Sequence, residues 1–283
     1  MADAPILVLG ATGGQGGAVT EALLSRGARV RALVRDPNRG SARRWADRGV
    51  EVVAGSLDDR SSLAAAMAGV AGVFVLTTPF EAGVDAEMAQ GRAILAAADA
   101  ARVPYLLFSS VAGADQRSGV PHFDSKARIE KELAAGEIPY SILGPTYFFD
   151  NALGGADRIQ SGVLDLPLPS DRPLQQLART DHGAFAAQVL LDPAPYLGRR
   201  IELASDAPTP AQMAAALSAA LGREVRHERV PLAEIRNPDM HAMWTFLNGR
   251  GYRVDIAALH AAHSEIAWTS FAEWARRTFG ATP

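Results

Sequence analysis

The fold is decided by the stretch Gly10-Ala11-Thr12-Gly13-Gly14-Gln15-Gly16, which directly follows the apolar run Ile6–Leu9. Its glycines have the spacing G-x-x-G-x-x-G, and an amphipathic helical stretch begins at Gly14. A glycine-rich turn between the first strand and the first helix of an α/β sheet is a variant of the dinucleotide-binding fingerprint. The alternative interpretation is a glycine-rich turn that holds no ligand, but the strand before it and the helix after it favour a nucleotide site.

Each glycine of this turn has a separate physical role. Gly10 permits a tight turn, Gly13 lets the backbone approach a pyrophosphate, and Gly16 lets the helix pack close to the sheet. N–H groups at the start of the helix then face the phosphate charge. The expected cofactor contacts in this turn are Gly10, Thr12, Gly13, Gly14, Gln15 and Gly16.

Apolar runs alternate with amphipathic helical stretches over the first 145 residues. The runs are nearly continuous, as expected when both faces of a parallel sheet are covered. This alternation predicts an α/β fold, a Rossmann-type doubly wound parallel sheet with right-handed crossovers. Strands are expected at Ile6–Leu9, Arg29–Val34, Glu51–Ala54, Gly72–Thr77, Tyr105–Ser109 and Tyr140–Leu143. Helices are expected at Gly14–Arg26, Arg39–Arg48, Ser61–Ala68, Val84–Ala101 and His122–Ala135.

After about Pro145 the pattern loosens and prolines cluster. The chain is therefore divided into an NAD(P)-binding Rossmann domain at 1–145 and a smaller C-terminal α+β subdomain on the substrate side at 146–283, with chain crossings expected between them. The secondary structure expected in the second part consists of strands at Leu174–Ala178 and Arg200–Leu203 and helices at Thr180–Leu191, Pro210–Leu221 and Ser270–Phe279.

Composition argues against several classes of function. The 283 residues carry a net charge of −3, so no overall basic field favours nucleic acid. The absence of cysteine removes disulfides and thiolate ligands, and the histidines show no metal-binding spacing. The start Met1-Ala2-Asp3-Ala4-Pro5 lacks the pattern of a secretory signal, and no apolar run is long enough for a membrane span. A soluble cytoplasmic protein is expected.

The end of the second predicted strand distinguishes NADH from NADPH. NAD-binding units tend to place an acid there to hold the ribose hydroxyls. This chain has Arg35, whose guanidinium can bind a ribose 2′-phosphate and stack on adenine, and Arg39 is close enough in sequence to help. Asp36, followed by Pro37, is expected to start a turn. The alternative for Arg35 is an exposed surface charge, and the pattern favours NADP(H).

Several further segments resemble the NmrA-like branch of the atypical short-chain dehydrogenase/reductase superfamily. The resemblance covers nearly the whole chain and is specific only when the segments are taken together. Besides the glycine-rich turn, it rests on Leu33-Val34-Arg35-Asp36, Gly55-Ser56-Leu57-Asp58-Asp59, Phe74-Val75-Leu76-Thr77-Thr78-Pro79, Phe108-Ser109-Ser110-Val111, His122-Phe123-Asp124-Ser125-Lys126, Phe148-Phe149-Asp150-Asn151, Thr180-Asp181 and Ile201-Glu202-Leu203-Ala204.

The resemblance implies cofactor contacts at the ends of later strands. Leu57 is expected to border the adenine, but relatives carry an acid where this chain has Ser56, which weakens the adenine hydrogen bond expected there. Relatives also tend to carry arginine before Pro145, where this chain has Gly144, and this departure puts the anchoring of that loop in doubt. The residues expected along the ribose are Thr77, Thr78 and Pro79.

The resemblance also identifies candidate catalytic residues. Typical members of the superfamily use a tyrosine and a lysine four residues apart, which places both side chains on one helix face. Lys126 stands at the lysine position, but His122 stands four residues before it, so the tyrosine acid is missing. Lys126 is expected to contact the cofactor, against the alternative of an ion pair with Glu130. His122 is a proton relay, a helix cap or a hydrogen-bond partner of the preceding loop.

Two pairs of residues lie at the expected ends of strands. Ser109 and Ser110 end the fifth strand, where they either bond the substrate or His122 or are ordinary polar ends. Tyr147 and Phe148 follow the sixth strand and Pro145. They either line the nicotinamide pocket or belong to the core.

Two functions fit these residues. The first is an NADPH-dependent oxidoreductase that transfers hydride to a quinone or similar conjugated carbonyl acceptor, because such an acceptor needs less help from a protein acid. The second is a catalytically weak or inactive NADP(H)-binding redox sensor that acts through a protein partner. The missing tyrosine favours the second function, and the lack of an extended polar tail or docking segment favours the first. An unusual biosynthetic enzyme is a third, weaker hypothesis.

The expected partners follow from these two functions. A small-molecule substrate, a quinone or another aromatic metabolite, is expected in a pocket that includes Trp244. A homodimer is a candidate assembly, and neither nucleic acid nor a membrane is expected as a direct partner.

Overall fold

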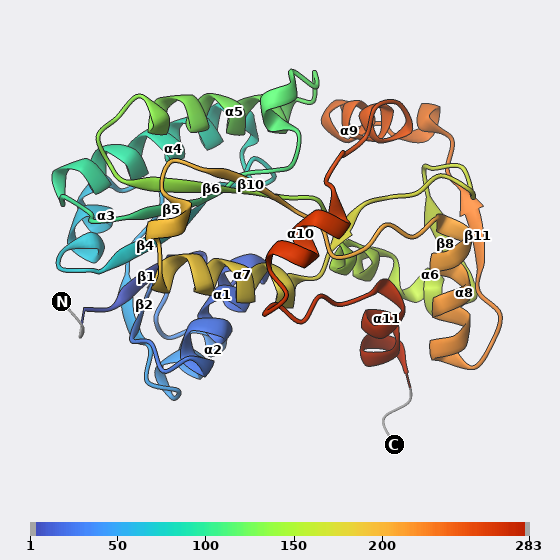
Figure 1. Cartoon of the computed structure of the whole chain (residues 1–283), viewed down its shortest axis with the longest axis horizontal. Helices are drawn as coiled ribbons and strands as arrows, with labels where there is room; N and C mark the ends of the chain where they lie inside the picture. The colour runs from blue at the N-terminus through green and yellow to red at the C-terminus, as the bar shows by residue number, and fades with distance from the viewer. Residues whose placement is uncertain (1–3, 281–283) are drawn as a thin grey trace. The chain divides into compact units, whose positions relative to one another are not determined.

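The computed structural model of the chain describes residues 4–280 (Figure 1). The expectation that the chain starts without a secretory signal rests partly on residues 1–3, which lie outside this range. Among the described residues, no helix combines the length and the apolar character that a membrane span requires. The cytoplasmic location stays a prediction.

The central element is a seven-stranded sheet with the strand order β10-β6-β5-β4-β1-β2-β3. Strands β1 to β6 pair in parallel. The order reverses at β1, which has β2 on one side and β4 on the other, so the sheet is doubly wound and the predicted Rossmann-type fold is confirmed. The strands are β1 (Ile6–Leu9), β2 (Val30–Val34), β3 (Glu51–Ala54), β4 (Gly72–Leu76), β5 (Leu106–Ser109), β6 (Tyr140–Pro145) and β10 (Arg200–Leu203).

Helices cover both faces of this sheet (Figure 1). One face carries α1 (Gly14–Ser25), α2 (Gly40–Ala46) and α7 (Arg179–Leu191), and the other carries α3 (Arg60–Met67), α4 (Gly83–Ala100) and α5 (Pro121–Ala134). Leu63, Ile94 and Ile129, one from each helix of the second set, share a buried cluster with Leu7 and Phe108 of the strands. Because helices bury both faces, the strands are apolar along their whole length.

The chain divides into two compact units, which are described separately. The first runs up to Asp115 and adds His122–Gly144 and His182–Ile201. The second consists of Gln116–Pro121, Pro145–Asp181 and the chain from Glu202 onward. The division into domains at residue 145 stays a prediction.

The second unit is built from short strands and several helices. Its core includes Phe149, whose ring centroid lies 5.3 Å from that of Phe271 and 5.9 Å from that of Trp274. Two parallel strand pairs, β7 with β9 and β8 with β11, accompany this core. The elements are β7 (Tyr147–Phe148), α6 (Ala156–Gln160), β8 (Val163–Leu166), β9 (Gln176–Leu177), α8 (Pro210–Leu221), β11 (Arg226–Arg229), α9 (Pro238–Asn248), α10 (Ile256–Ala262) and α11 (Phe271–Phe279).

The structure departs from the predicted elements mainly after residue 145. The strand expected at Leu174–Ala178 is only the two-residue β9, and Gln176 also forms a bridge with Asp206. The strand at Arg200–Leu203 is confirmed, but it joins the central sheet beside β6. Strands β7, β8 and β11 and helices α6, α9 and α10 were not predicted. β11 reads Arg-His-Glu-Arg, and such a strand has no apolar alternation to reveal it.

Candidate functional site

The glycine-rich turn is closed by contacts that only glycine permits. Gly10 has a φ of +69°, in the left-handed region that side chains disfavour. The Gly13 amide donates to the Gly10 carbonyl at 2.9 Å. A Cβ on Gly16 would lie 2.3 Å from the same oxygen, so the helix start packs directly on the turn. The indole N–H of Trp45 donates to the Ala11 carbonyl at 2.9 Å and fixes the turn from α2.

The start of α1 has the features of an anion site. Gly13 is the N-cap of α1. Because glycine has no side chain, no N-cap side chain occupies the amides of the first helical turn. The amides of Gly14, Gln15 and Gly16 fall in the first helical turn, where intrahelical acceptors are missing. Thr12, Gly13 and Gly14 are exposed. The amides and the positive end of the helix dipole therefore suit a phosphate group.

Ser109 links the end of β5 to this turn and to α7. Its hydroxyl donates to Oε1 of Gln15 at 2.7 Å and lies 3.1 Å from Nε2 of His182. Because the hydroxyl proton goes to Gln15, Nε2 of His182 is the donor toward Ser109. Burial lowers the pKa of His182 to about 4, so the ring stays neutral near pH 7. His182 therefore positions Ser109 and Gln15 and does not supply a proton.

The lowered pKa of His182 predicts a loss of stability in acid. An unfolded histidine has a pKa of about 6.5, so below that pH the unfolded chain binds a proton that the folded chain refuses. Stability is full above pH 6.5 and falls as the pH drops toward 4, by about 3 kcal/mol. Chemical denaturation at several pH values should show a shallower acid loss for His182→Gln. The exposed His241→Asn is the control and should follow wild type, and identical curves for all three proteins would contradict the assignment.

Arg35 and Asp36 follow β2, as the sequence predicts. The Arg35 side chain is exposed, with its guanidinium 3.4 Å from a Glu81 carboxylate oxygen. The Asp36 carboxylate accepts from the Asn38 amide at 2.8 Å, so Asp36 starts a turn as expected. To bind a 2′-phosphate, the exposed guanidinium would have to give up only its weak ion pair with Glu81.

The other residues predicted to follow the strands occupy different environments. Thr77 and Pro79 are buried, and Thr78 is half-buried. Leu57 packs on the apolar cluster beside α3 and α4. The Ser56 amide donates to the Ser62 hydroxyl at 3.2 Å, so this residue also helps to order the loop before α3. Contacts of these residues with a cofactor stay predictions.

Lys126 is held by a buried carboxylate that the sequence analysis missed. Its ammonium donates to Glu87 Oε1 at 2.8 Å, to the Thr77 carbonyl at 3.0 Å and to the Thr77 hydroxyl at 3.3 Å. Glu87 is fully buried on α4 and also accepts from the hydroxyls of Thr77 and Ser125. The Glu87 carboxylate, the Thr77 carbonyl and the Thr77 hydroxyl together match the three N–H donors of the Lys126 ammonium. Lys126 therefore ties α5 to α4 and to the end of β4.

His122 lies at the start of α5 among aromatic rings. Its ring centroid is 5.6 Å from that of Phe80 and 4.7 Å from that of Phe123. His122 is buried, whereas the Phe80 side chain is 70% exposed. The buried His122 ring therefore contacts two aromatic rings, one of which, Phe80, is largely exposed.

Ser110 belongs to a second buried ionic network. Its hydroxyl donates to Glu130, whose other carboxylate oxygen accepts from Arg200 at 3.0 Å. Arg200 also donates to the Val111 carbonyl at 2.6 Å. A Cβ on Gly144 would lie 3.2 Å from this guanidinium, so glycine leaves the room that Arg200 occupies. The alternative pairing of Lys126 with Glu130 is wrong, because Glu130 bonds Ser110 and Arg200 and Lys126 bonds Glu87.

Pro145, Tyr147 and Phe148 belong to the second unit. The Tyr147 ring centroid lies 5.5 Å from that of Trp244. Burial raises the pKa of Tyr147 to about 12. Contact of these residues with a nicotinamide stays a prediction. Among residues 4–280, no cluster of three or more histidine or carboxylate side chains has a metal-binding arrangement.

Comparison with known proteins identifies the family. The family described as NmrA-like matches residues 2–275 of the chain. The chain belongs to the NmrA-like family. It is 29% identical over 232 residues to quinone oxidoreductase 2 of Escherichia coli, covering 81% of this chain and 79% of that protein. It is 31% identical over 232 residues to an NAD(P)H azoreductase of Xenophilus azovorans, covering 82% of this chain and 79% of that protein.

Solved structures agree with this membership. The NADPH complex of the E. coli quinone oxidoreductase QOR2 matches this NmrA-like chain with a TM-score of 0.82 at 27% identity, covering 97% of this chain and 100% of that one. The negative transcriptional regulator NmrA in complex with NADP has a TM-score of 0.81 at 21% identity, over 99% of this chain and 96% of that one, and shares the fold.

Three residues that position the site in this NmrA-like chain escaped the sequence analysis: Trp45, Glu87 and His182. Each acts through contacts with residues 34 to 73 positions away in the sequence. One signal was available for Glu87, because it interrupts the apolar face of a helix that buries Met88, Ile94 and Ala97. A carboxylate buried in such a face requires a partner.

Proposed function

We propose that this NmrA-like chain binds NADP(H) and transfers hydride from NADPH to a quinone or a similar conjugated carbonyl acceptor. The observation that carries the proposal is the glycine-closed turn before α1, with exposed residues and first-turn amides that suit a pyrophosphate. Relatives named as a quinone oxidoreductase and an azoreductase support the reaction class. The relative in complex with NADPH supports the cofactor.

The residues of the first unit fit this cofactor. Gly13, Gly14 and Gly16 present backbone without obstructing side chains, and Gln15 is held by Ser109. We assign the 2′-phosphate to the exposed guanidinium of Arg35. The remaining residues that we assign to the cofactor in this unit are Gly10, Thr12, Ser56, Leu57, Thr77, Thr78, Pro79 and Ser109, whereas Lys126 acts by holding Thr77 in place.

In the proposed reaction the chain's own residues mainly hold the parts of the site in position, and they contribute little acid catalysis. NADPH, when bound, supplies the hydride. Lys126 uses its ammonium donors on Glu87 and Thr77, so it fixes the segment that begins at Thr77. An imidazole nitrogen of His122 is the candidate donor of the proton that a reduced quinone requires, with water as the other source. An acceptor that tolerates a solvent proton suits a site that lacks the tyrosine.

A redox-sensing regulator is the second candidate function. Two observations favour it: the tyrosine four residues before Lys126 is missing, and the Lys126 ammonium is already engaged by protein acceptors. A regulator would bind NADP(H) through the same turn and leave it unchanged. The two functions therefore differ in turnover and share the cofactor site.

Turnover distinguishes the two functions. We expect the purified chain to consume NADPH, followed by loss of its reduced-nicotinamide absorbance, when quinones and enones are added. In protein that a thermal melt shows to be folded, Lys126→Met should lower this rate by about tenfold or more, because the Thr77 segment loses its anchor. Lys131→Met is the matched control, since Lys131 is exposed on the same helix. NADPH that binds and is never consumed with any acceptor would favour the regulator.

The assignment of Arg35 gives a separate prediction. Arg35→Ser should weaken NADPH binding by about tenfold or more and leave NADH binding unchanged, because only NADPH carries the 2′-phosphate. Arg44→Ser, which removes an exposed arginine of α2, should bind NADPH like wild type. If Arg35→Ser lost equal affinity for NADPH and NADH, Arg35 would not be the residue that recognises the 2′-phosphate.

A further inference from the structure

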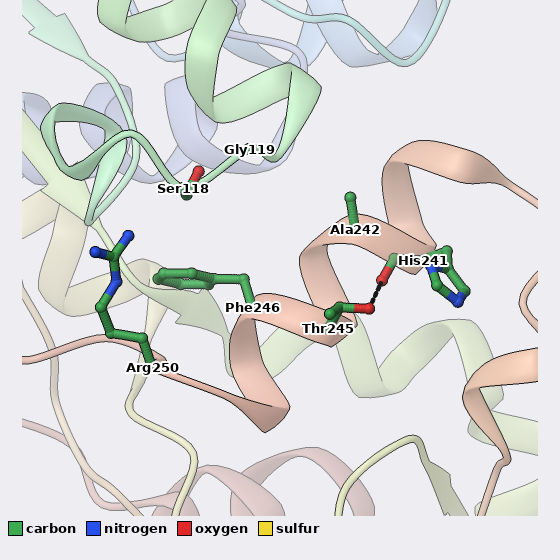
Figure 2. Close-up of a pocket in the computed structure, with 7 residues that line it drawn as sticks. All are labelled: Ser118, Gly119, His241, Ala242, Thr245, Phe246 and Arg250. Carbon is green, nitrogen blue, oxygen red and sulfur yellow. Dashed lines mark hydrogen bonds between the residues drawn. The ribbon is translucent and has the colours of Figure 1, made fainter.

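The second unit contains a pocket that the cofactor proposal does not use. It has a volume of about 390 Å³ and lies between one face of α9 and the loop before α5 (Figure 2). This volume is within the range of pockets that hold small organic molecules. The lining residues are Ser118, Gly119, His241, Ala242, Thr245, Phe246 and Arg250.

The pocket is separate from the Tyr147–Trp244 ring pair. Helix α9 buries Met243, Trp244, Phe246 and Leu247. With 3.6 residues per turn, His241, Ala242 and Thr245 lie away from Met243 and Leu247, and the buried Phe246 lies between Ala242 and Met243 around the helix. Figure 2 shows Phe246 pointing toward Arg250, and Ala242 on the side of α9 toward Gly119, whereas the His241 imidazole points away from that loop. The α9 residues that line the pocket therefore lie on a different side of the helix from Met243 and Leu247, and Trp244 is not among them.

Arg250 gives the pocket its charge. Its side chain is exposed, and its guanidinium lies 5.8 Å from the ring centroid of Phe246. One guanidinium nitrogen donates to the Gln116 carbonyl at 2.9 Å. A guanidinium has five N–H donors in a plane, so this bond fixes the group and leaves others for a ligand. No carboxylate lines the pocket within the described part of the chain.

Hydrogen bonds fix the end of α9 on one side of the pocket, and the loop on the other side has a hydrogen bond and a strained backbone conformation. Arg172 donates to the Leu247 carbonyl at 2.8 Å and to the Gly249 carbonyl, which fixes the end of α9 just before Arg250. In the opposite loop, Arg117 has a φ of +51°, a conformation that costs energy for a residue with a Cβ. The Val120 amide donates to the Ser118 hydroxyl at 3.2 Å, which leaves the hydroxyl proton for another acceptor.

We propose that this pocket binds a planar organic anion of the aromatic carboxylate class. The Arg250 guanidinium and the Ser118 hydroxyl bind the carboxylate, and the Phe246 ring with the Ala242 methyl group contacts the apolar ring. A cation fixed before the ligand arrives loses less side-chain entropy on binding. The pocket lies wholly in the second unit, so the proposal stands whether or not the first unit binds a dinucleotide.

Calorimetric titration with 2-naphthoate and its neutral isostere 2-naphthamide tests the proposal. We expect the full chain to bind naphthoate with a Kd below about 1 mM and naphthamide about tenfold more weakly. Arg250→Met should weaken naphthoate binding by about tenfold and leave naphthamide unchanged. Arg253→Met is the control, because Arg253 is exposed nearby in sequence but does not line the pocket.

A second variant tests the pocket without changing any charge. Ala242→Trp fills the space between α9 and the loop and should abolish binding of both probes. Thermal melts of each variant establish that the chain is folded. The proposal is overturned if folded Arg250→Met binds naphthoate like wild type, if naphthamide binds as tightly as naphthoate, or if Ala242→Trp retains binding. Absence of saturable naphthoate binding to wild type would overturn it equally.

Discussion

Glu87→Gln is expected to lower the free energy of unfolding by about 3–5 kcal/mol, because it leaves the Lys126 ammonium buried opposite a neutral amide. Glu87 is fully buried and accepts from Lys126, Thr77 and Ser125, so no solvent replaces the lost charge. Urea denaturation of the two proteins at neutral pH measures the difference directly.

Two further variants separate the buried pair from ordinary ion pairing. Glu132→Gln breaks the exposed Arg92–Glu132 pair, which joins the same two helices, and should change stability little. The double variant Glu87→Met with Lys126→Met removes both charges and should recover most of the loss, because an apolar pair needs no compensation. If Glu87→Gln were as stable as Glu132→Gln, the assignment of a buried charge pair would be wrong.

Gly16→Ala is expected to weaken NADPH binding by about tenfold or more and to destabilise the fold by about 1–3 kcal/mol. The added Cβ would lie 2.3 Å from the Gly10 carbonyl oxygen and 2.4 Å from its carbon. Both are backbone atoms, so the turn and the start of α1 must separate. Calorimetric titration with NADPH and a denaturation curve measure the two effects.

Gly17→Ala is the matched control for this variant. A Cβ at Gly17 would lie 3.4 Å from the Ala11 carbonyl, which is an ordinary contact. Replacing a glycine inside a helix by alanine should stabilise the chain by about 0.5–1 kcal/mol. NADPH affinity should stay close to that of wild type. Equal losses of affinity in Gly16→Ala and Gly17→Ala would mean that the close approach of Gly16 to Gly10 is unimportant.

The first half of the fold could be predicted because its signals are local. The apolar strands and the glycines that end helices, such as Gly27 and Gly49, are visible in any single sequence window. The turn of Gly10–Gly16 needs only its own glycine spacing. The strands of the second unit are short, and β11 is entirely polar, so their pairing depends on partners remote in the chain.

The environment of Lys126 could not be predicted for a related reason. The sequence places Lys126 near Glu130, one helical turn away, whereas the structure brings Glu87 to it from α4. Arg200 likewise fills the space that Gly144 leaves, although 56 positions separate them in the chain. Which carboxylate meets which cation is decided by how the helices and strands pack.

Titration of the wild-type chain with NADPH, followed by a matched titration with NADH, is the most direct test of the cofactor site. Our account predicts saturable binding of one NADPH per chain and binding of NADH that is weaker by about tenfold or more. Absence of saturable binding of NADPH, or equal affinity for the two dinucleotides, would contradict it.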